Sequence, residues 1–188
     1  MTQSQPTHIS QLPAYARGLV AAAREVAPSL DVFPVPAARL PATERLLLDH
    51  RRDMTPTLER YHDATIYLDV PASDDRDDWY HRHSILRLQG SGRAVEFGMI
   101  RIHLPALPPP VQQLIRADRM PLGTLLHRYR VPHVGSPGGF YLVTGLGQFA
   151  SALGIPPDSR CYARANRLLL PTGTIICELL EILPPPAD

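Results

Sequence analysis

The stretch TIICELLEIL, residues 174–183, places acidic residues within a run of large apolar ones that is typical of a β-strand. Because successive side chains of a strand point to opposite faces, four residues would share one face: Ile176, Glu178, Leu180 and Ile182. Glu181 lies near the end of the strand, and we expect its carboxylate to reach solvent. Glu178 lies inside the apolar row, where a buried carboxylate is costly unless a partner compensates its charge. The sequence therefore predicts a cationic partner for Glu178.

Two interpretations of Glu178 follow from this position. In the first, an arginine satisfies a purely structural carboxylate. In the second, the carboxylate faces a closed pocket and has an altered protonation state or a catalytic role. The preceding strand supplies Arg164 and Arg167 as candidate partners. Both interpretations predict an arginine beside Glu178, so only a pocket next to the pair would distinguish them.

The rest of the chain predicts an α+β fold with an antiparallel sheet. Apolar runs flank the Gly-Ser-Gly turn at 90–92, and a second hairpin turns at 171–173 before the run at 174–183. Further strands are predicted at 64–70 and 138–147, which gives five or six in all. Helices are predicted in four places: 14–27, 43–63, 108–118 and 121–129. Hairpin-linked strands, rather than alternating strands and helices, favour the antiparallel arrangement.

Composition narrows the class of protein. The 188 residues suggest one domain over residues 1–188, with residues 1–10 disordered. The net charge of +1 favours neither nucleic acid nor a membrane surface as a partner. With no apolar run long enough for a bilayer and no signal peptide, we expect a cytoplasmic monomer or homodimer. Cys161 and Cys177 are expected as buried thiols, with a disulfide between them left open.

Two further motifs offer candidate sites. Pro121-Leu122-Gly123 precedes an apolar helical turn, whose free main-chain N–H groups can bind an anion. The simpler interpretation of this motif is a turn that only redirects the chain. His81 and His83 lie two residues apart on one strand face and could chelate a metal, but spacing supplies no third ligand, so no metal site is predicted. The sequence contains no phosphate loop, dinucleotide-binding fingerprint or GxSxG motif.

Taken in order, four segments resemble motifs of the chorismate lyase family, over about residues 46–184. The segments are LLLDHRRDMTPTLE (46–59), ILRLQGSGRAVEFGMIRIHLP (85–105), MPLGTLL (120–126) and RANRLLLPTGTIICELL (164–180). The resemblance implies a six-stranded antiparallel sheet with helices and loops covering an internal pocket. It also implies a reaction, in which chorismate loses pyruvate to leave 4-hydroxybenzoate, with no metal or organic cofactor.

The resemblance also implies site residues. The family glutamate corresponds to Glu178, and a main-chain contact of the Pro-Leu-Gly turn corresponds to Leu122. The family arginine that binds a substrate carboxylate falls on Ser84, or on His83 if the turn differs by one residue. Because Arg82 lies on the same strand face as Ser84, its guanidinium could replace the missing one.

The sequence therefore predicts a carbon–oxygen lyase that acts on an aromatic or enolpyruvyl carboxylate. The predicted catalytic residues are Glu178 and Arg82. The predicted substrate-binding residues are Leu122, Gly123, Ser84, His83, Arg164 and His133. Two alternatives stay open: an enzyme of this fold with a different substrate, such as a cyclase or isomerase, and a non-catalytic small-molecule-binding module. A related fold serves as the effector domain of some transcription regulators, although the first forty residues here suggest no recognition helix.

Overall fold

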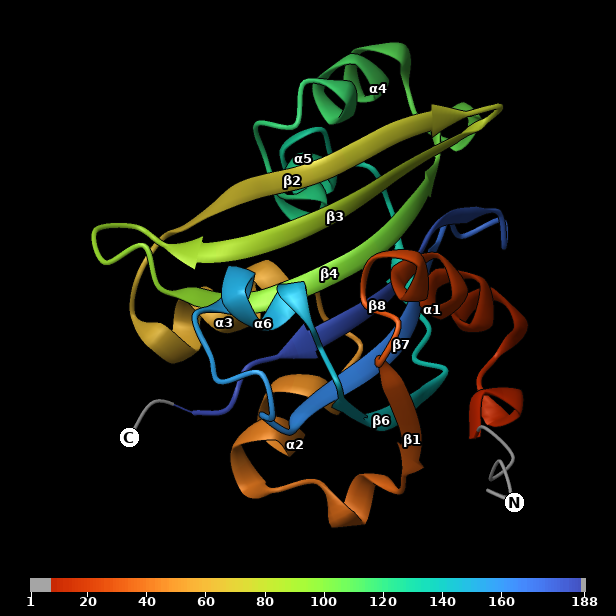
Figure 1. Ribbon diagram of the computed structural model, residues 1–188. Coiled ribbons are helices and arrows are strands. Elements are labelled where there is room, and N and C mark those ends of the chain that lie inside the picture. The colour runs from red at the N-terminus through yellow and green to blue at the C-terminus, as the bar shows by residue number, and fades with distance from the viewer. Residues whose placement is uncertain (1–7, 187–188) are drawn as a thin grey trace.

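One antiparallel sheet organises the chain (Figure 1). The structure, a computed structural model, describes residues 8–186. The strands follow the order β1-β6-β7-β8-β4-β3-β2, and β5 pairs with β7. They are β1 (Asp31–Val35), β2 (Ile66–Arg76), β3 (Trp79–Leu88), β4 (Ala94–His103), β5 (Val134–Gly135), β6 (Gly139–Thr144), β7 (Cys161–Leu169) and β8 (Ile175–Leu183). Every one of these pairings is antiparallel, which confirms the predicted fold class.

Helices cover both faces of the sheet. The α-helices are α1 (Ala14–Val26), α2 (Ala42–Leu48), α3 (Met54–His62), α4 (Pro109–Arg116), α5 (Leu122–Arg128) and α6 (Gln148–Leu153). Three short 3-10 helices join them: η1 (His8–Gln11), η2 (Ala37–Arg39) and η3 (Leu104–Ala106). Helices α1 and α6 pack on one face, and α2 to α5 pack on the other. Figure 1 shows α1 and α6 in front of the sheet, with α3 and α5 behind it.

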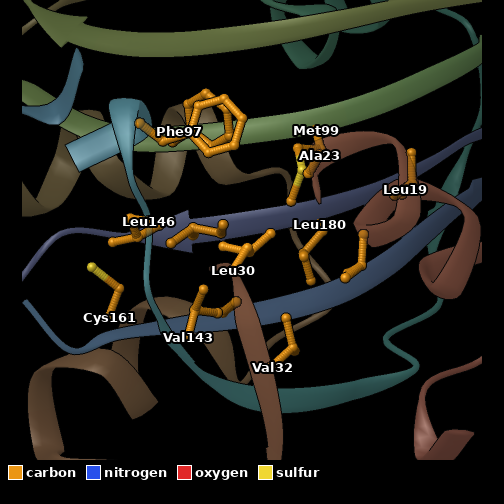
Figure 2. Packing of buried hydrophobic residues seen from close by; sticks show 14 of the residues in the cluster. Leu19, Ala23, Leu30, Val32, Phe97, Met99, Val143, Leu146, Cys161 and Leu180 are labelled. Carbon is orange, nitrogen blue, oxygen red and sulfur yellow. The ribbon is translucent and has the colours of Figure 1, made fainter. Parts of the chain in front are cut away.

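The core on the face of α1 and α6 follows directly from the sequence pattern. Leu19 and Ala23 recur at helical spacing on α1 and meet Met99 and Leu180 from the central strands (Figure 2). Phe149 of α6 closes the same cluster. Each fully buried side chain of this size contributes about 1.5–3 kcal/mol to folding, so this face is held chiefly by apolar burial.

The two predicted hairpins are present, and glycine makes their turns. Gly90 and Gly92 have φ values of 90° and 68° between β3 and β4, and Gly173 has a φ of 87° between β7 and β8. These backbone conformations are accessible to glycine at little cost. The hairpins place β3 beside β4 and β7 beside β8, and the pairing of β4 with β8 joins them at the centre of the sheet.

The structure also differs from the prediction in detail. The sheet has eight strands among the described residues, since it includes β1 and β5, which were not predicted. Strand β2 also continues to Arg76, beyond the predicted end at residue 70. The disorder predicted for residues 1–10 is wrong for residues 8–10, which form part of η1. Residues 1–7 lie outside the described part of the chain.

Both cysteines are buried free thiols, as expected. Burial raises the pKa of the Cys161 thiol to about 12 and that of Cys177 still further, so neither forms a thiolate readily. Between residues 8 and 186, no helix combines the length and apolar character that a bilayer crossing requires.

Candidate functional site

A small cavity lies on the sheet face covered by α2 to α5. It encloses about 60 Å³ beneath the first residues of α3 and α5. Four strands contribute its polar side chains, which are Arg82, Ser84, Glu96, Arg164, Asn166 and Glu181. Asp53 and Thr55, at the start of α3, line it as well, so charged groups of both signs share one small space, where electrostatic interactions are stronger than at the surface.

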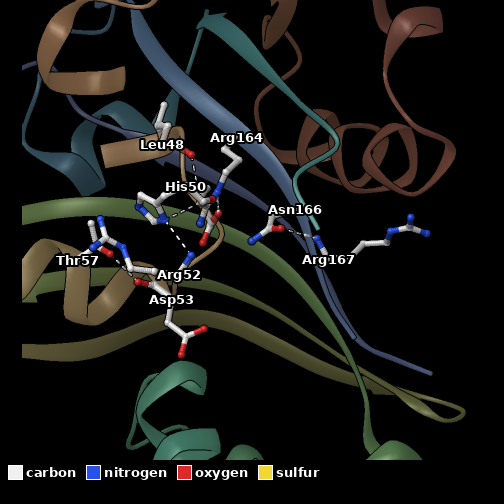
Figure 3. A network of polar contacts seen from close by, with 9 residues as sticks. Leu48, His50, Arg52, Asp53, Thr57, Arg164, Asn166 and Arg167 are labelled. Carbon is white, nitrogen blue, oxygen red and sulfur yellow. Dashed lines mark hydrogen bonds and ion pairs between the residues drawn. The ribbon is translucent and has the colours of Figure 1, made fainter. Parts of the chain in front are cut away.

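Arg164 of β7 is the most buried of these residues. Its side chain is fully buried, and its Nε donates to Oε2 of Glu181 on β8 over 2.6 Å. Its Nη1 donates to the carbonyl oxygens of His50 at 2.7 Å and Leu48 at 3.1 Å, in the segment that joins α2 to α3 (Figure 3). Its Nη2 has no hydrogen-bond partner among residues 8–186. The Nη2 group of this buried, cavity-lining cation is therefore left without an acceptor in the described part of the chain.

Glu96 of β4 lies next to this pair. Burial raises the pKa of its carboxyl well above the usual range, and the negative charge of Glu181 raises it further, while Arg164 partly offsets both effects. This shift favours the protonated carboxyl, which can donate a hydrogen bond as well as accept one. Its Oε2 has no partner in the described part of the chain.

Arg82 of β3 approaches the cavity from the other side. Its Nη1 donates to Oδ1 of Asp118 at 3.1 Å, and the Tyr80 hydroxyl donates to Oδ2 of the same carboxylate at 2.5 Å. Asp118 follows α4, so this ion pair ties that loop to the sheet. The Nε of Arg82 is buried and unpaired within residues 8–186. A second guanidinium thus has a donor without an acceptor.

The floor of the cavity requires a residue without a side chain. Gly98 of β4 lies between Ser84 and Glu96, and a Cβ at this position would be 2.7 Å from Ser84 Oγ and 3.3 Å from Glu96 Oε1. Ser84 Oγ donates to the Gly98 carbonyl oxygen at 3.3 Å. Any larger residue at position 98 would occupy the space that the polar side chains surround.

The roof is closed by contacts between the starts of α3 and α5. Asp53 precedes α3, and its Cβ lies 3.2 Å from the position that a Cβ of Gly123 would take. The Asp53 carboxylate accepts a hydrogen bond from Nε2 of His133 at 3.0 Å, and this bond raises the pKa of the imidazole. The two helices can approach this closely because position 123 carries no side chain.

The structure brings together most, but not all, of the predicted site residues. The lining of the cavity includes Arg82, Ser84, Leu122, Gly123 and Arg164. His133 contacts Asp53 at its edge. His83 lies on the opposite face of the sheet, where its ring packs against Phe97 and Phe149 with centroids 5.7 and 5.4 Å apart.

Glu178 lies outside this cavity. Its neighbours Cys177 and Leu179 line the space, so the Glu178 side chain points to the opposite face. The predicted arginine partner exists, but it is Arg101 of β4 rather than Arg164 or Arg167, and its guanidinium binds the Glu178 carboxylate and stacks 4.7 Å from the Trp79 ring centroid. The structural interpretation of Glu178 is therefore the one that matches its surroundings.

Sequence reasoning missed Glu96, Asn166 and Glu181. The expectation that Glu181 reaches solvent is wrong, since this residue is only 3% exposed and lines the cavity. The run AVEFGMI at 94–100 contained the signal for Glu96, because it is an acidic residue in an apolar strand, the same pattern that singled out Glu178. Among residues 8–186, no group of three or more ligand-type side chains could hold a metal ion.

Comparison with known proteins shows a shared fold but assigns the chain to no family. No protein-family model and no curated protein matches the chain. PhnF from Mycobacterium smegmatis superposes with a TM-score of 0.53 at 12% identity, over 92% of this chain and 86% of PhnF. The effector domain of PhnF gives a TM-score of 0.53 at 10% identity, over 71% of this chain and 89% of that domain. YydK from Bacillus subtilis, described as a possible transcriptional regulator, gives 0.49 at 10% identity, over 65% of this chain and 59% of YydK.

These comparisons correct the expectation drawn from the resemblance. No family model matches the chain, and the structures that superpose with TM-scores of 0.53 are described as PhnF, the effector domain of PhnF and a Staphylococcus aureus gene product, none of them as a lyase. The assignment to the chorismate lyase family, and with it the predicted release of pyruvate from chorismate and a role in aromatic biosynthesis, is therefore wrong. At 10–12% identity the likeness to PhnF shows a shared fold and nothing finer.

Proposed function

We propose that this domain binds a small organic carboxylate in the cavity beneath α3 and α5, as a non-catalytic ligand-binding module. The observation that carries the proposal is the pair of unpaired donors, Arg82 Nε and Arg164 Nη2, which belong to two buried guanidiniums lining one cavity. A buried donor without an acceptor costs about 1–3 kcal/mol. A carboxylate supplies several acceptor positions in one small group, so it suits two converging guanidiniums.

The protonated Glu96 supports the same class of ligand. Its carboxyl proton can be donated to a ligand oxygen, whereas an ionised Glu96 would repel an anion. Arg164 and Arg82 are each already paired with one carboxylate, so the ligand adds one further negative charge to a site with two cations. The shared fold with a protein described as an effector domain supports binding rather than turnover.

The volume of the cavity limits the ligand in the present conformation. About 60 Å³ is far below the roughly 300–1,000 Å³ typical of sites for drug-sized ligands. A short-chain acid therefore fits most readily, and an aromatic acid requires the starts of α3 and α5 to separate at the contact between Asp53 and Gly123. A ligand that opens this contact would report its binding through the position of the two helices.

Isothermal titration of the purified protein tests the proposal. We expect acetate, benzoate or 4-hydroxybenzoate to bind at least tenfold more tightly than the corresponding neutral amides. Arg82→Lys keeps the charge but removes the Nε donor, and we expect it to weaken binding tenfold or more. Arg101→Lys, on the opposite face of the sheet, is the matched control and should leave the affinity unchanged.

Two outcomes would overturn the proposal. Equal affinity for acids and amides, or an unchanged affinity in Arg82→Lys, would remove the carboxylate site. Enzymatic release of pyruvate from chorismate by the same preparation, above the uncatalysed rate, would show that the domain is not a binding module alone.

A further inference from the structure

A second hollow lies away from the cavity and is larger. It is a groove of about 550 Å³ bounded by α2, the end of α3, the start of β4, the end of α6 and the segment after β8. No residue lines both the groove and the cavity. Its volume falls within the roughly 300–1,000 Å³ of ordinary small-molecule sites, which the cavity does not reach.

Part of the groove wall is apolar. Leu47, Val95, Leu153 and Leu183 form part of its lining, and each is itself buried. The prolines at 184–186 extend the wall beyond β8. Such a surface can bury the hydrocarbon body of a ligand, at about 25 cal/mol for each Å² of apolar area removed from water.

One buried carboxylate faces this apolar groove without a partner. Glu44, in the first turn of α2, is only 6% exposed and lines the groove. Within residues 8–186 it makes no hydrogen bond and no ion pair. Burial raises the pKa of the Cys161 thiol, and the proximity of Glu44 raises it further, so Glu44 lies towards the inner side of α2. Acidic residues are seldom this little exposed unless they are paired, and residues 8–186 supply no cation to Glu44.

Arg93 also lines the groove, and its guanidinium contacts His62 rather than Glu44. Arg93 is exposed, and its Nη2 contacts Nδ1 of His62 at 3.2 Å. Burial and the charge of Arg93 both lower the pKa of His62, so the imidazole is neutral and accepts this hydrogen bond. Tyr61, next to His62 and 44% exposed, adds an aromatic ring to the rim that can interact with a cation.

We propose that this groove binds a primary amine with an aromatic or aliphatic body. The ammonium group pairs with Glu44, the body lies against the apolar wall, and the Tyr61 ring flanks the ligand at the rim. An ammonium supplies three donors on one compact charge, which matches a single buried carboxylate. This site is independent of the carboxylate cavity in position and in the charge that it selects.

Three probes of similar size, each with a phenyl ring, test which charge the groove prefers: phenethylamine, 2-phenylethanol and phenylacetate. We expect phenethylamine to bind at least tenfold more tightly than the alcohol, and phenylacetate to bind the groove weakest. Phenylacetate can also enter the carboxylate cavity, so the two sites are followed separately by NMR. The amide shifts of Leu47 and Val95 report binding in the groove, and that of Ser84 reports binding in the cavity. Failure of the cavity proposal would leave the groove measurement unaffected.

Two variants make the proposal decisive. Glu44→Gln keeps the shape and removes the charge, and we expect it to remove the preference for phenethylamine over the alcohol. Thr43→Trp fills the groove from its half-exposed wall and should abolish binding of all three probes in the groove while leaving Glu44 in place. Glu25→Gln, an exposed residue of α1, is the control and should bind as the native protein does. Equal affinity for amine and alcohol, or an unchanged preference in Glu44→Gln, would overturn the proposal.

Discussion

Glu96 and Glu181 both lie close to the Arg164 guanidinium, and this arrangement governs the protonation of the two carboxyl groups. Arg164 donates to Glu181 and satisfies it as an ion pair. Burial, together with the negative charge beside it, raises the pKa of the Glu96 carboxyl. The cavity therefore holds one acid in an ion pair with Arg164 and one whose surroundings favour the protonated form, and this difference comes from their surroundings rather than from their residue type.

This protonation has a consequence for stability that Glu96→Gln would test. The folded protein holds the Glu96 proton at pH values where the unfolded chain releases it. Its stabilising contribution is thus complete below the unfolded pKa and is lost as pH rises through the folded pKa. Glutamine mimics the neutral acid at every pH. We expect Glu96→Gln to match the native protein near pH 4 and to be more stable at pH 7, by about 1.4 kcal/mol for each unit of pKa elevation.

Urea unfolding at pH 4, 5.5 and 7 measures this difference. Ser84→Ala, which removes a neutral hydroxyl from the same cavity, should shift stability by the same amount at each of the three pH values. If native and Glu96→Gln proteins show parallel pH profiles, Glu96 is ionised in the folded state and the account of the cavity is wrong.

At the same scale, strand alternation identified Glu178 as a carboxylate among apolar residues, but it missed the burial of Glu181 and did not say which face holds the cavity. Glu178 and Glu181 are both buried, on opposite faces of β8, and each has an arginine partner. The helices that cover each face come from segments distant in sequence, so the periodicity of one strand cannot say what lies above it. The placement of Arg82 on the same face as Ser84 was predictable because it depends on alternation alone.

At the scale of elements, glycine decides how closely segments approach. Gly145 follows β6 and has a φ of 65°, and a Cβ there would lie 1.9 Å from the carbonyl oxygen of Ser29. That carbonyl belongs to the segment leading into β1, so the turn after β6 is pressed against main chain that cannot rotate away. Gly154 ends α6 with a φ of 70°, but a Cβ there would meet nothing within 4 Å.

These two glycines form a matched pair for substitution by alanine. Gly154→Ala carries only the cost of a left-handed conformation, about 1–2 kcal/mol. Gly145→Ala carries that cost and a clash with backbone, and we expect a loss of at least about 4 kcal/mol or failure to fold. Thermal and urea unfolding of both variants measure the difference. Equal losses would mean that the turn after β6 can move away from Ser29.

The elements that sequence reasoning found are those with strong local signals. The two hairpins were predicted because glycine turns separate long apolar runs. Strand β1 contains Pro34, which removes a backbone donor, and it is an edge strand, the position at which a sheet tolerates proline. Strand β5 has two residues and no pattern to detect. Such short or interrupted strands exist because a neighbouring strand is already in place.

At the scale of the whole molecule, Arg164 joins the two layers that enclose the cavity. It rises from the sheet, binds Glu181 on the neighbouring strand and holds the main chain of Leu48 and His50 between α2 and α3. The same segment continues to Asp53 and the roof of the cavity. The residue proposed to bind the ligand is thus also the residue that holds α2 and α3 against the sheet.

A double-mutant cycle separates the charge pair from this structural link. Arg164→Met leaves Glu181 buried and uncompensated beside Glu96, and we expect a loss of about 3–5 kcal/mol. Glu181→Leu leaves Arg164 with two carbonyl partners, and we expect a smaller loss. The double variant replaces both charges with apolar groups, so its loss should be less than the sum of the single losses, by at least about 1 kcal/mol. Urea unfolding at pH 7 gives all four free energies. Additive losses would show that the ion pair contributes nothing to folding, and that Arg164 stabilises the molecule only through the main chain of Leu48 and His50.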